Sequence, residues 1–239
     1  LIAIIIFTSY AQALNRFSLD LESGMVFSGY NDVQIPRSTG TLISLSKELK
    51  TDATIFFRAK LTYAISDKHR LSIFYAPLQL KGSGKINQEV NFEGVVFPAD
   101  TPLKSIYRFD SYRLSYQYKI YNTDKLQVGI GLTAKIRDAA ISLEGADTIS
   151  EKTNTGFVPL INFRLGWMFA DKIGLLLEGD ALAAPQGRAE DVLLALQYKP
   201  SPNFGLKLGY RILEGGSDVE EVYSFTLINY LVIGAILTL

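Results

Sequence analysis

The sequence predicts an all-β fold, a closed antiparallel up-and-down transmembrane β-barrel of ten strands. The first observation is a long alternation of apolar and polar residues with period 2, as in LQVGIGLTAKIRDAAISL (126–143). The second is strand length, because most alternating segments reach the about 9–11 residues that a membrane strand needs. The third is that short connections alternate with mostly longer ones, which is typical of membrane barrels.

Ten segments carry this alternation, and helical periodicity is nearly absent between them. They lie at 16–30, 53–65, 70–83, 105–120, 125–144, 154–169, 173–184, 189–199, 204–214 and 221–239. Four connections, 66–69, 122–124, 170–172 and 200–203, are short and consist of turn-forming residues. The other five, 31–52, 84–104, 145–153, 185–188 and 215–220, are mostly longer, polar and rich in Gly and Pro. We therefore expect short periplasmic turns at one end, longer external loops at the other, and both termini at the short-turn end.

Aromatic residues cluster near both ends of these segments. Those beside the short turns are Tyr63, Tyr118, Phe169, Tyr198 and Phe204, and those toward the loops are Phe27, Tyr75, Tyr107, Phe157 and Tyr223. Two aromatic girdles at the membrane interfaces would produce this pattern. A soluble, calycin-like barrel of ten strands remains the alternative, but it explains only the enrichment and not the clustering.

The N-terminal residues indicate a secretory signal. The run LIAIIIF (1–7) is apolar, and Ala11-Gln12-Ala13 fits a small-x-small cleavage pattern. We therefore expect a signal peptide over 1–13, truncated at its start, and a single transmembrane β-barrel domain over 14–239. A buried N-terminal strand is the alternative for the same residues.

The face opposite the apolar one is expected to line the lumen, because a membrane sheet must close on itself to pair its backbone groups. In strand order this predicts a lumen charge network of Asp20, Glu22, Arg58, Lys60, Arg113, Lys135, Arg137, Arg164, Glu178, Asp180, Lys207 and Arg211. Eight of these side chains are cationic and four anionic, an excess of about four positive charges. Because a ten-stranded barrel is only slightly wider than one that side chains fill, we expect a polar-packed interior with at most a narrow water path.

One hairpin can be assigned a register. If residues 170–172 form a three-residue turn, antiparallel pairing places Arg164 opposite Glu178 and Asn162 opposite Asp180, all facing inward. A two-residue turn would move Arg164 and Glu178 to opposite faces of the sheet. The charges therefore favour the three-residue turn and predict a structural Arg164–Glu178 ion pair, with gating or selectivity as a less favoured role.

Composition excludes several classes of function. The 24 basic and 24 acidic side chains give a net charge of zero, which argues against nucleic-acid binding. There is no cysteine, and the single histidine, His69, lies in a predicted periplasmic turn, far from the external loops. We therefore predict no catalytic, cofactor-binding or metal-binding residues and no enzymatic activity.

Four polar segments need no function beyond their place in the fold. The segment 184–191 fits a tight external turn, since Glu190 and Asp191 would point to opposite faces and form a poor acid–base pair. The acidic segment 214–221 fits a solvated loop that could attract divalent cations but lacks EF-hand spacing, and 81–85 lacks the Walker pattern. The segment LISLSKEL (42–49) could form a short helix on the barrel rim or a small additional strand.

Several stretches resemble segments of small porin-like outer-membrane β-barrel proteins of Gram-negative bacteria. They are NDVQIPRSTGT (31–41), GLTAKIRDAA (131–140), DALAAPQGRAEDV (180–192) and LEGGSDVEEVYSF (213–225). The resemblance spans nearly the whole chain after residue 13 and implies the barrel fold and the cell outer membrane, but no reaction or ligand. Such barrels usually end on an aromatic residue, whereas this chain ends Leu237-Thr238-Leu239.

Three functions follow as hypotheses. The first is a monomeric barrel with a charged, constricted lumen, acting as a narrow anion-preferring channel for small solutes or as a structural membrane component. The second is a sealed barrel whose external loops bind lipopolysaccharide or a surface partner. The third and weakest is an outer-membrane enzyme. The expected partners are outer-membrane lipid, lipopolysaccharide and the outer-membrane assembly machinery, with no cofactor.

Overall fold

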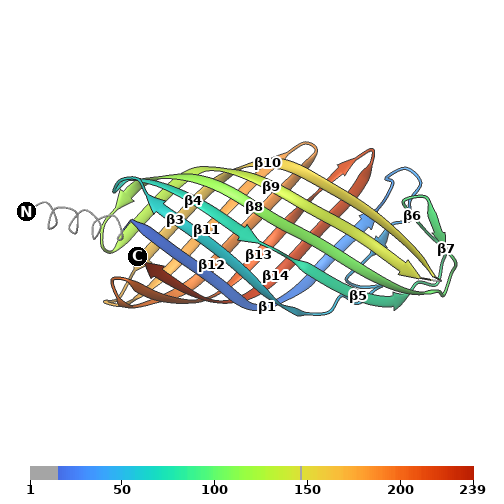
Figure 1. Ribbon diagram of the computed structural model, residues 1–239, viewed down its shortest axis with the longest axis horizontal. Coiled ribbons are helices and arrows are strands. Elements are labelled where there is room, and N and C mark those ends of the chain that lie inside the picture. The colour runs from blue at the N-terminus through green and yellow to red at the C-terminus, as the bar shows by residue number, and fades with distance from the viewer. Residues whose placement is uncertain (1–15, 146) are drawn as a thin grey trace, which may run out of the picture.

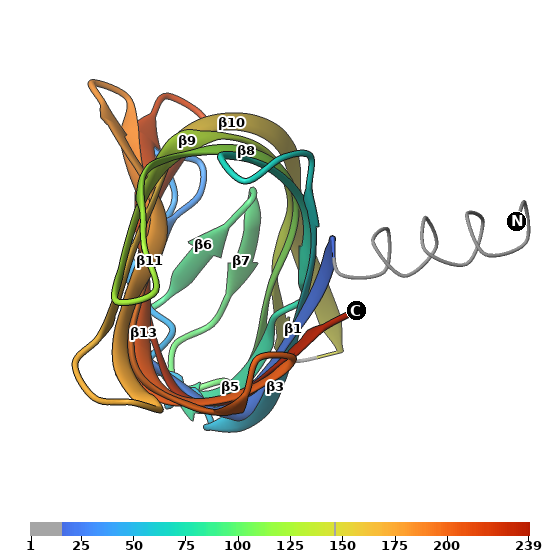
Figure 2. The same cartoon turned by 90° about the vertical axis from the view of Figure 1, so that its left-hand side faces the viewer.

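The computed structural model is a closed antiparallel barrel (Figures 1 and 2), and it describes residues 16–145 and 147–239. Its wall has ten strand positions, here called staves, of which nine hold one strand and one holds two strands end to end. The strands are β1 (Phe17–Gln34), β2 (Ile43–Ser44), β3 (Thr54–Ala64), β4 (His69–Ala76), β5 (Gln79–Lys85), β6 (Val90–Phe92), β7 (Val95–Phe97), β8 (Pro102–Asn122), β9 (Leu126–Gly145), β10 (Thr148–Met168), β11 (Ile173–Ala184), β12 (Gly187–Ser201), β13 (Phe204–Val219) and β14 (Val222–Thr238). The signal peptide expected at 1–13 lies outside the described residues.

Ten staves confirm the predicted strand number. The wall strands β1, β3, β4 and β8–β14 pair in chain order, and β14 closes the sheet by pairing antiparallel with β1. β4 and β5 are the two halves of one stave, since both pair with β8 and only Pro77 and Leu78 separate them. Proline has no N–H to donate to the ladder, which explains the break at this point. Across the described part of the chain, no helix is long and apolar enough to cross a membrane.

The two ends of the barrel differ, although less in loop length than the sequence predicts. The four predicted short turns lie at the end that carries both described chain ends, here called the turn end. At the other end, the loop end, only 35–53 and 86–101 are long connections. The loops predicted at 145–153 and 215–220 are wrong, because strands run through most of these residues to tight turns. The connection predicted at 185–188 is a tight turn at 185–186, as expected for the segment 184–191. These strand ends are polar like loops because they extend past the membrane.

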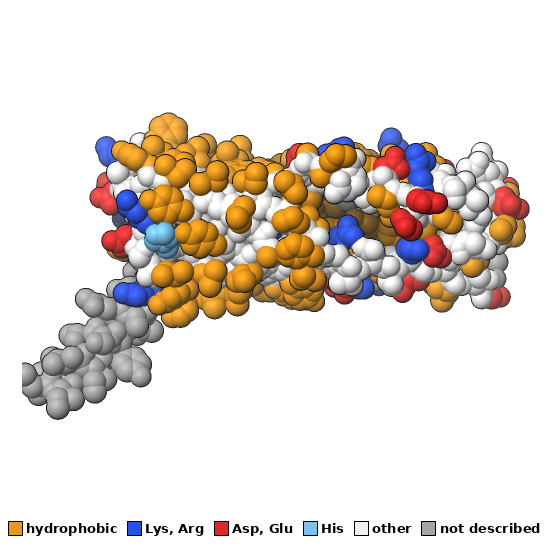
Figure 3. Space-filling model, turned by 90° about the horizontal axis from the view of Figure 1, so that it is seen from above, with side chains coloured by type: hydrophobic (Ala, Val, Ile, Leu, Met, Phe, Trp, Pro, Cys, Tyr) orange, Lys and Arg blue, Asp and Glu red, His pale blue; other side chains and the backbone are white. Residues whose placement is uncertain are grey.

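Exposed apolar side chains form a belt on the half of the barrel next to the turn end, and Figure 3 shows one face of this belt. On β9 the outward residues are apolar from Leu126 to Ile136, a length that fits a membrane strand. The next outward residue is Asp138, which accepts a hydrogen bond from Arg108 at 2.6 Å. This hydrogen bond holds the pKa of the Asp138 carboxyl below its ordinary value. The belt therefore ends between Ile136 and Asp138, and the strands continue beyond it.

Aromatic side chains mark both edges of the belt. At the turn end the rings of Phe17 and Tyr63 lie 5.0 Å apart, and at the other edge those of Tyr75 and Tyr112 are stacked at 5.1 Å. Tyr107, predicted for the outer girdle, instead faces the interior and is only 5% exposed. That prediction was wrong because the barrel interior is apolar at this height.

The two long connections at the loop end fold into the barrel and fill it. Their buried side chains are Ile35, Ile43, Leu45, Leu49, Ile86, Val90, Phe92 and Phe97. These residues, here called the apolar plug, pack against inward side chains of the wall such as Val26, Leu103 and Leu143. Figure 2 shows β6 and β7 lying across the inside of the ring of strands.

The stretch 42–49 belongs to this plug. Ile43 and Ser44 form β2, which pairs with β1, and residues 45–49 form turns. The strand alternative for this segment is therefore confirmed, and the rim helix is wrong. The pairing turns Ile43 inward, where it is 1% exposed, so this segment closes the barrel instead of lying on its edge.

The wall is not hydrogen-bonded along its whole height between β10 and β11. These strands pair from Met168 and Gly174 up to Ile161 and Ala181. Above that level β10 stays paired with β9, but residues 149–160 have no strand partner on the β11 side within the described sheet. The surface is hollowed where the apolar belt meets the charged loop end (Figure 3). The barrel is thus fully paired within most of the belt and opens along one seam above it.

The position of the belt predicts how the outer face tolerates charge. Leu132 lies in the middle of the belt and Ile149 lies beyond it, and their side chains are 68% and 70% exposed. We expect Leu132→Arg to lower the free energy of unfolding by about 2–4 kcal/mol and Ile149→Arg by less than about 1 kcal/mol, because only Leu132 faces hydrocarbon. Urea unfolding of the protein folded into phospholipid vesicles measures both. Equal losses for the two variants would contradict this placement of the belt.

Candidate functional site: the lumen charge network

One connected set of charged side chains fills the interior of the membrane-spanning half. We call it the lumen network, and its members are Asp20, Glu22, Arg58, Lys60, Arg113, Arg164, Glu178, Asp180, Asp191, Lys207 and Arg211. The alternation along the strands places all of them except Asp191 on the inner face from sequence alone. Most are nearly inaccessible to solvent.

Asp191 on β12 lies at the centre of the network. Its carboxylate accepts hydrogen bonds from the guanidinium groups of Arg58, Arg113 and Arg211, which come from three different strands. The contact with Arg211 is 2.6 Å long, and Asp191 is only 1% exposed. Because charges buried in a low-dielectric interior are stable only when they are paired, each of these four groups requires the others.

The arginines around Asp191 also pack against aromatic rings. The guanidinium carbons of Arg58 and Arg113 lie 4.8 and 4.9 Å from the centroid of the Phe74 ring. Arg113 donates a further hydrogen bond of 2.7 Å to Asp180. Stacking and ion pairing together fix the planes of both guanidinium groups, so this layer of the lumen is packed rather than fluid.

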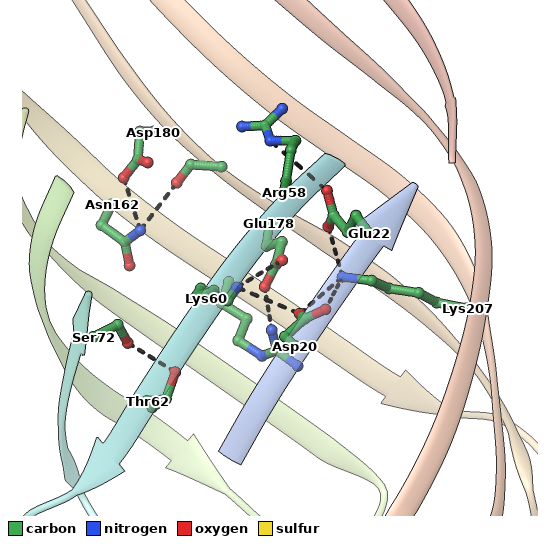
Figure 4. Close-up of polar contacts among 12 residues, drawn as sticks. Asp20, Glu22, Arg58, Lys60, Thr62, Ser72, Asn162, Glu178, Asp180 and Lys207 are labelled. Carbon is green, nitrogen blue, oxygen red and sulfur yellow. Dashed lines mark hydrogen bonds and ion pairs between the residues drawn. The ribbon is translucent and has the colours of Figure 1, made fainter. Parts of the chain in front are cut away.

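Asp180 connects the charged residues to a set of neutral donors. Thr133 donates its hydroxyl hydrogen to Asp180 over 2.6 Å, and the amide of Asn162 donates over 2.8 Å. Gln117 in turn donates to the Asn162 carbonyl oxygen at 2.6 Å. Figure 4 shows Asn162 turned toward Asp180. These contacts satisfy the carboxylate on the side that faces away from Arg113.

Lys207 on β13 lies at the centre of the part of the network nearest the turn end. Its ammonium nitrogen is 2.7 Å from Asp20 and 2.6 Å from Glu22, both on β1 (Figure 4). Gly234 on the adjacent strand leaves room for the lysine, since a Cβ there would lie 2.5 Å from Lys207 Cε. A small residue at 234 is therefore needed for the lysine to reach both carboxylates.

The predicted Arg164–Glu178 ion pair is present. β10 and β11 pair in the register of the three-residue turn, with Arg164 opposite Glu178 and Asn162 opposite Asp180. Arg164 donates a hydrogen bond to Glu178, which also accepts one from Lys60 at 2.9 Å. The register prediction is thus confirmed.

Three acidic residues come close enough to raise the question of a metal ion. Carboxylate oxygens of Asp20, Glu22 and Glu178 lie within 4.8 Å of one another. The ammonium group of Lys207 contacts Asp20 and Glu22, and that of Lys60 contacts Glu178. Because two ammonium groups already provide the positive charge, these residues do not fit a cation site.

Lys135 and Arg137 are inside the barrel but outside the network. Lys135 makes no ion pair within the described ranges, and its ammonium nitrogen lies 4.8 Å from the centroid of the Phe109 ring. Arg137 donates a hydrogen bond to Asn154 on β10, close to the seam. Lys135 is directly opposite Arg113 of the network on β8, and Arg137 is one inward position farther toward the loop end.

This arrangement changes the predicted electrostatics of the lumen. The lumen network contains six cations and five anions, so it is nearly neutral. Adding Asp191, which the sequence prediction missed, reduces the predicted excess for the lumen from four positive charges to three. Among the ion-paired members the excess is one, because Lys135 and Arg137 form no ion pair within the described residues. A nearly neutral, paired network is suited to cross-bracing the barrel wall and provides no continuous lining of free charge.

Asp191 could have been found from its strand. Asp191 and Gln197 share the inward phase of β12, but the inward residues between them, Leu193 and Ala195, are apolar. That interruption hides the alternation, and the neighbouring Pro185–Arg188 sequence suggests an external turn. The expectation that Glu190 and Asp191 point to opposite faces agrees with their exposure, since Asp191 is buried and Glu190 is partly exposed.

His69 lies at the turn end, as predicted, but it is not simply solvated. It begins β4 and lies in the aromatic girdle, where its Nδ1 is 2.6 Å from the Tyr116 hydroxyl. Its ring centroid is 5.2 Å from that of Tyr118. This places the only histidine at the opposite end of the barrel from the loops.

Comparisons with known proteins identify the fold. No protein-family model and no curated protein matches the chain. The outer membrane protease OmpT from Escherichia coli matches with a TM-score of 0.58 and 9% identity, over 94% of this chain and 97% of that chain. Ail of Yersinia pestis matches at 0.41 and 12% identity, over 93% and 98%. OprG from Pseudomonas aeruginosa matches at 0.40 and 9% identity, over 94% and 97%. The chain is a small barrel of the outer-membrane type, as the sequence resemblance implied.

The network predicts a large effect of a nearly isosteric change at its centre. Asp191→Asn removes the charge that three buried guanidinium groups share, and we expect it to lower the free energy of unfolding by about 3–5 kcal/mol. The control is Asp218→Asn, which removes the exposed partner of Arg37 and should cost less than about 1 kcal/mol. Guanidinium chloride unfolding in vesicles compares the two. A small effect at Asp191 would contradict its central position.

Proposed function

We propose that this chain is a sealed outer-membrane barrel that acts through the parts outside the membrane and not as a channel. The observation that carries the proposal is that the lumen is blocked at two heights, by two different sets of side chains. The lumen network closes the membrane-spanning half above a cavity that opens at the turn end, and the apolar plug fills the half beyond the belt. Within the network Arg58, Asp191 and Lys207 are each no more than 2% exposed.

The part outside the membrane is large and well packed. β8, β9 and β10 continue past the belt as one paired sheet, which is capped by the apolar plug. Leu42, Val96 and Ile149 lie on neighbouring segments of this cap and are 52–70% exposed. Hydrogen bonds from Thr41 to Asn91 and from Ser150 to Phe92 join these segments. Exposed aliphatic side chains on a rigid, water-exposed cap favour a role in binding a surface partner.

Two other functions fit the geometry less well. A narrow solute channel would need a water path through side chains that are paired across the whole lumen. A histidine-dependent hydrolase acting at the loops would need His69 there, and this residue lies at the turn end. The likeness to a protease is a likeness of fold at 9% identity and carries no activity to this chain.

Single-channel recording tests the proposal. We expect the refolded protein to insert into a planar bilayer without producing discrete conductance steps, because the lumen network and the apolar plug both exclude mobile ions. A conducting porin recorded in the same lipid is the positive control, and heat-modifiable migration on a gel verifies folding. Reproducible steps would overturn the proposal in favour of a narrow channel, and a salt gradient would then report whether it prefers anions.

A further inference from the structure

A cavity of about 280 Å³ opens at the turn end and reaches into the lumen network, since eight of the eleven network members line it. Its mouth is formed by strand ends and turns, including Arg16, Gln127 and Pro202. Arg113 and Arg211 of the network are among its lining residues farthest from the mouth. Because the network fills the lumen above it, the cavity is a pocket with one entrance.

Cationic side chains outnumber carboxylates in the lining of this cavity, which contains seven Arg and Lys residues and four acidic residues. The four carboxylates, those of Asp20, Glu22, Glu178 and Asp180, are each already paired with a cation. Arg70 and Lys199 line the cavity, and neither forms an ion pair with any part of the chain that the structure describes. Lys119, 9% exposed, is also without an ion pair there. Arg164 has only Glu178, which it shares with Lys60. This differs from the network above, where every cation has a carboxylate.

The strand register brings these cations together. Gly129 on β9 pairs with Lys119 on one side and with Arg164 on the other, so no side chain separates the two. Arg70 is opposite Gln117 on β8, one inward position from Lys119. The acidic residues of the nearby turns do not compensate the excess, because each is followed directly by a lysine: Asp67-Lys68, Asp124-Lys125 and Asp171-Lys172.

Unpaired donors around the same cavity provide an independent observation. Gln197 is 3% exposed and lines the cavity, and its side-chain Nε2 is buried without a hydrogen-bond acceptor. The Nε atoms of Arg164 and Arg211 are also buried without an acceptor. A buried donor left unsatisfied is costly, and an acceptor bound in the cavity would satisfy it. All three groups donate hydrogen, so the missing partner is an acceptor.

We propose that this vestibule is a binding site for a small, multiply charged anion, a carboxylate or a phosphate, taken from the periplasmic side. Arg70, Arg164 and Lys199 line the cavity and supply the positive charge, and Gln197 supplies a neutral donor. A cavity of about 280 Å³ admits a molecule of the size of a small polycarboxylate and excludes large polymers. The site is distinct from the external cap and does not depend on whether the barrel conducts.

Isothermal titration of the refolded protein in an uncharged detergent tests this proposal. The probes are citrate and inorganic phosphate, titrated at constant ionic strength against a chloride background. We expect saturable binding of at least one probe, and the two titrations show whether the site prefers carboxylate or phosphate. The double variant Arg70→Gln/Lys199→Gln should bind about tenfold or more weakly, since charge-assisted hydrogen bonds are each worth about 1.5–3 kcal/mol.

The matched control is Lys104→Gln/Lys152→Gln. It removes the same charge from two exposed or half-exposed lysines at the loop end and should leave binding unchanged. Equal weakening by both double variants, or no saturable binding of either probe, would overturn the proposal. Circular dichroism and heat-modifiable migration show that each variant folds.

A second measurement needs no variant. Citrate or phosphate should protect Lys199, which lines the cavity, from acylation by an amine reagent, read by mass spectrometry, while Lys104 reacts at the same rate with and without the anion. If the anion protected the pocket lysine no more than it protects Lys104, the proposal would be overturned, even if the titration had released heat. Neither measurement involves conductance, so this proposal and that of a sealed barrel can fail separately.

Discussion

Pairing of β14 with β1 is the constraint on which the rest of the structure depends. Backbone N–H and C=O groups cannot be left unpaired in hydrocarbon, so the sheet must close. Once it is closed, the inward side chains between the turn-end cavity and the apolar plug are cut off from bulk water. Charged residues in that position must be neutralised by one another. The contacts of Asp191 on β12 with Arg58 on β3 and Arg113 on β8 are the result, and they brace opposite walls of the barrel.

The positive and negative charges of the barrel interior are most nearly balanced within the lumen network. In the lumen network six cations face five anions, and each carboxylate contacts at least one cation. At the mouth of the turn end, where solvent enters, Arg70 and Lys199 have no such partners. The excess of positive charge that the sequence suggests for the lumen as a whole is therefore concentrated at its mouth and, through Lys135 and Arg137, at its upper edge.

The sequence was sufficient to predict the number of staves, the inward and outward faces of the membrane-spanning strands, and the register of one hairpin. It was sufficient because period-2 patterning records burial, and because the Arg164–Glu178 pair is compatible with only one turn length. It failed where the inner face becomes apolar. Leu193 interrupts the polar face of β12 and hid Asp191, and Tyr107 was assigned to the wrong face. It also failed at the strand ends beyond the membrane, because polar residues on water-exposed strands have the composition of loops.

These failures have one physical origin. Along each long strand the same alternate positions face inward, but the inward residues change from polar to apolar and the outward ones from apolar to polar. On β9 the outward residues are apolar up to Ile136 and charged at Asp138, while the inward ones change from Lys135 to Ile141 and Leu143. The lower half is therefore a membrane barrel with a polar interior, and the upper half is a barrel in water with an apolar core. The long connections 35–53 and 86–101 supply much of that core. A chain that needed only to span the membrane would gain nothing from building a second core outside it. We infer that this second core exists to hold the external surface rigid, which places the requirement for function outside the membrane.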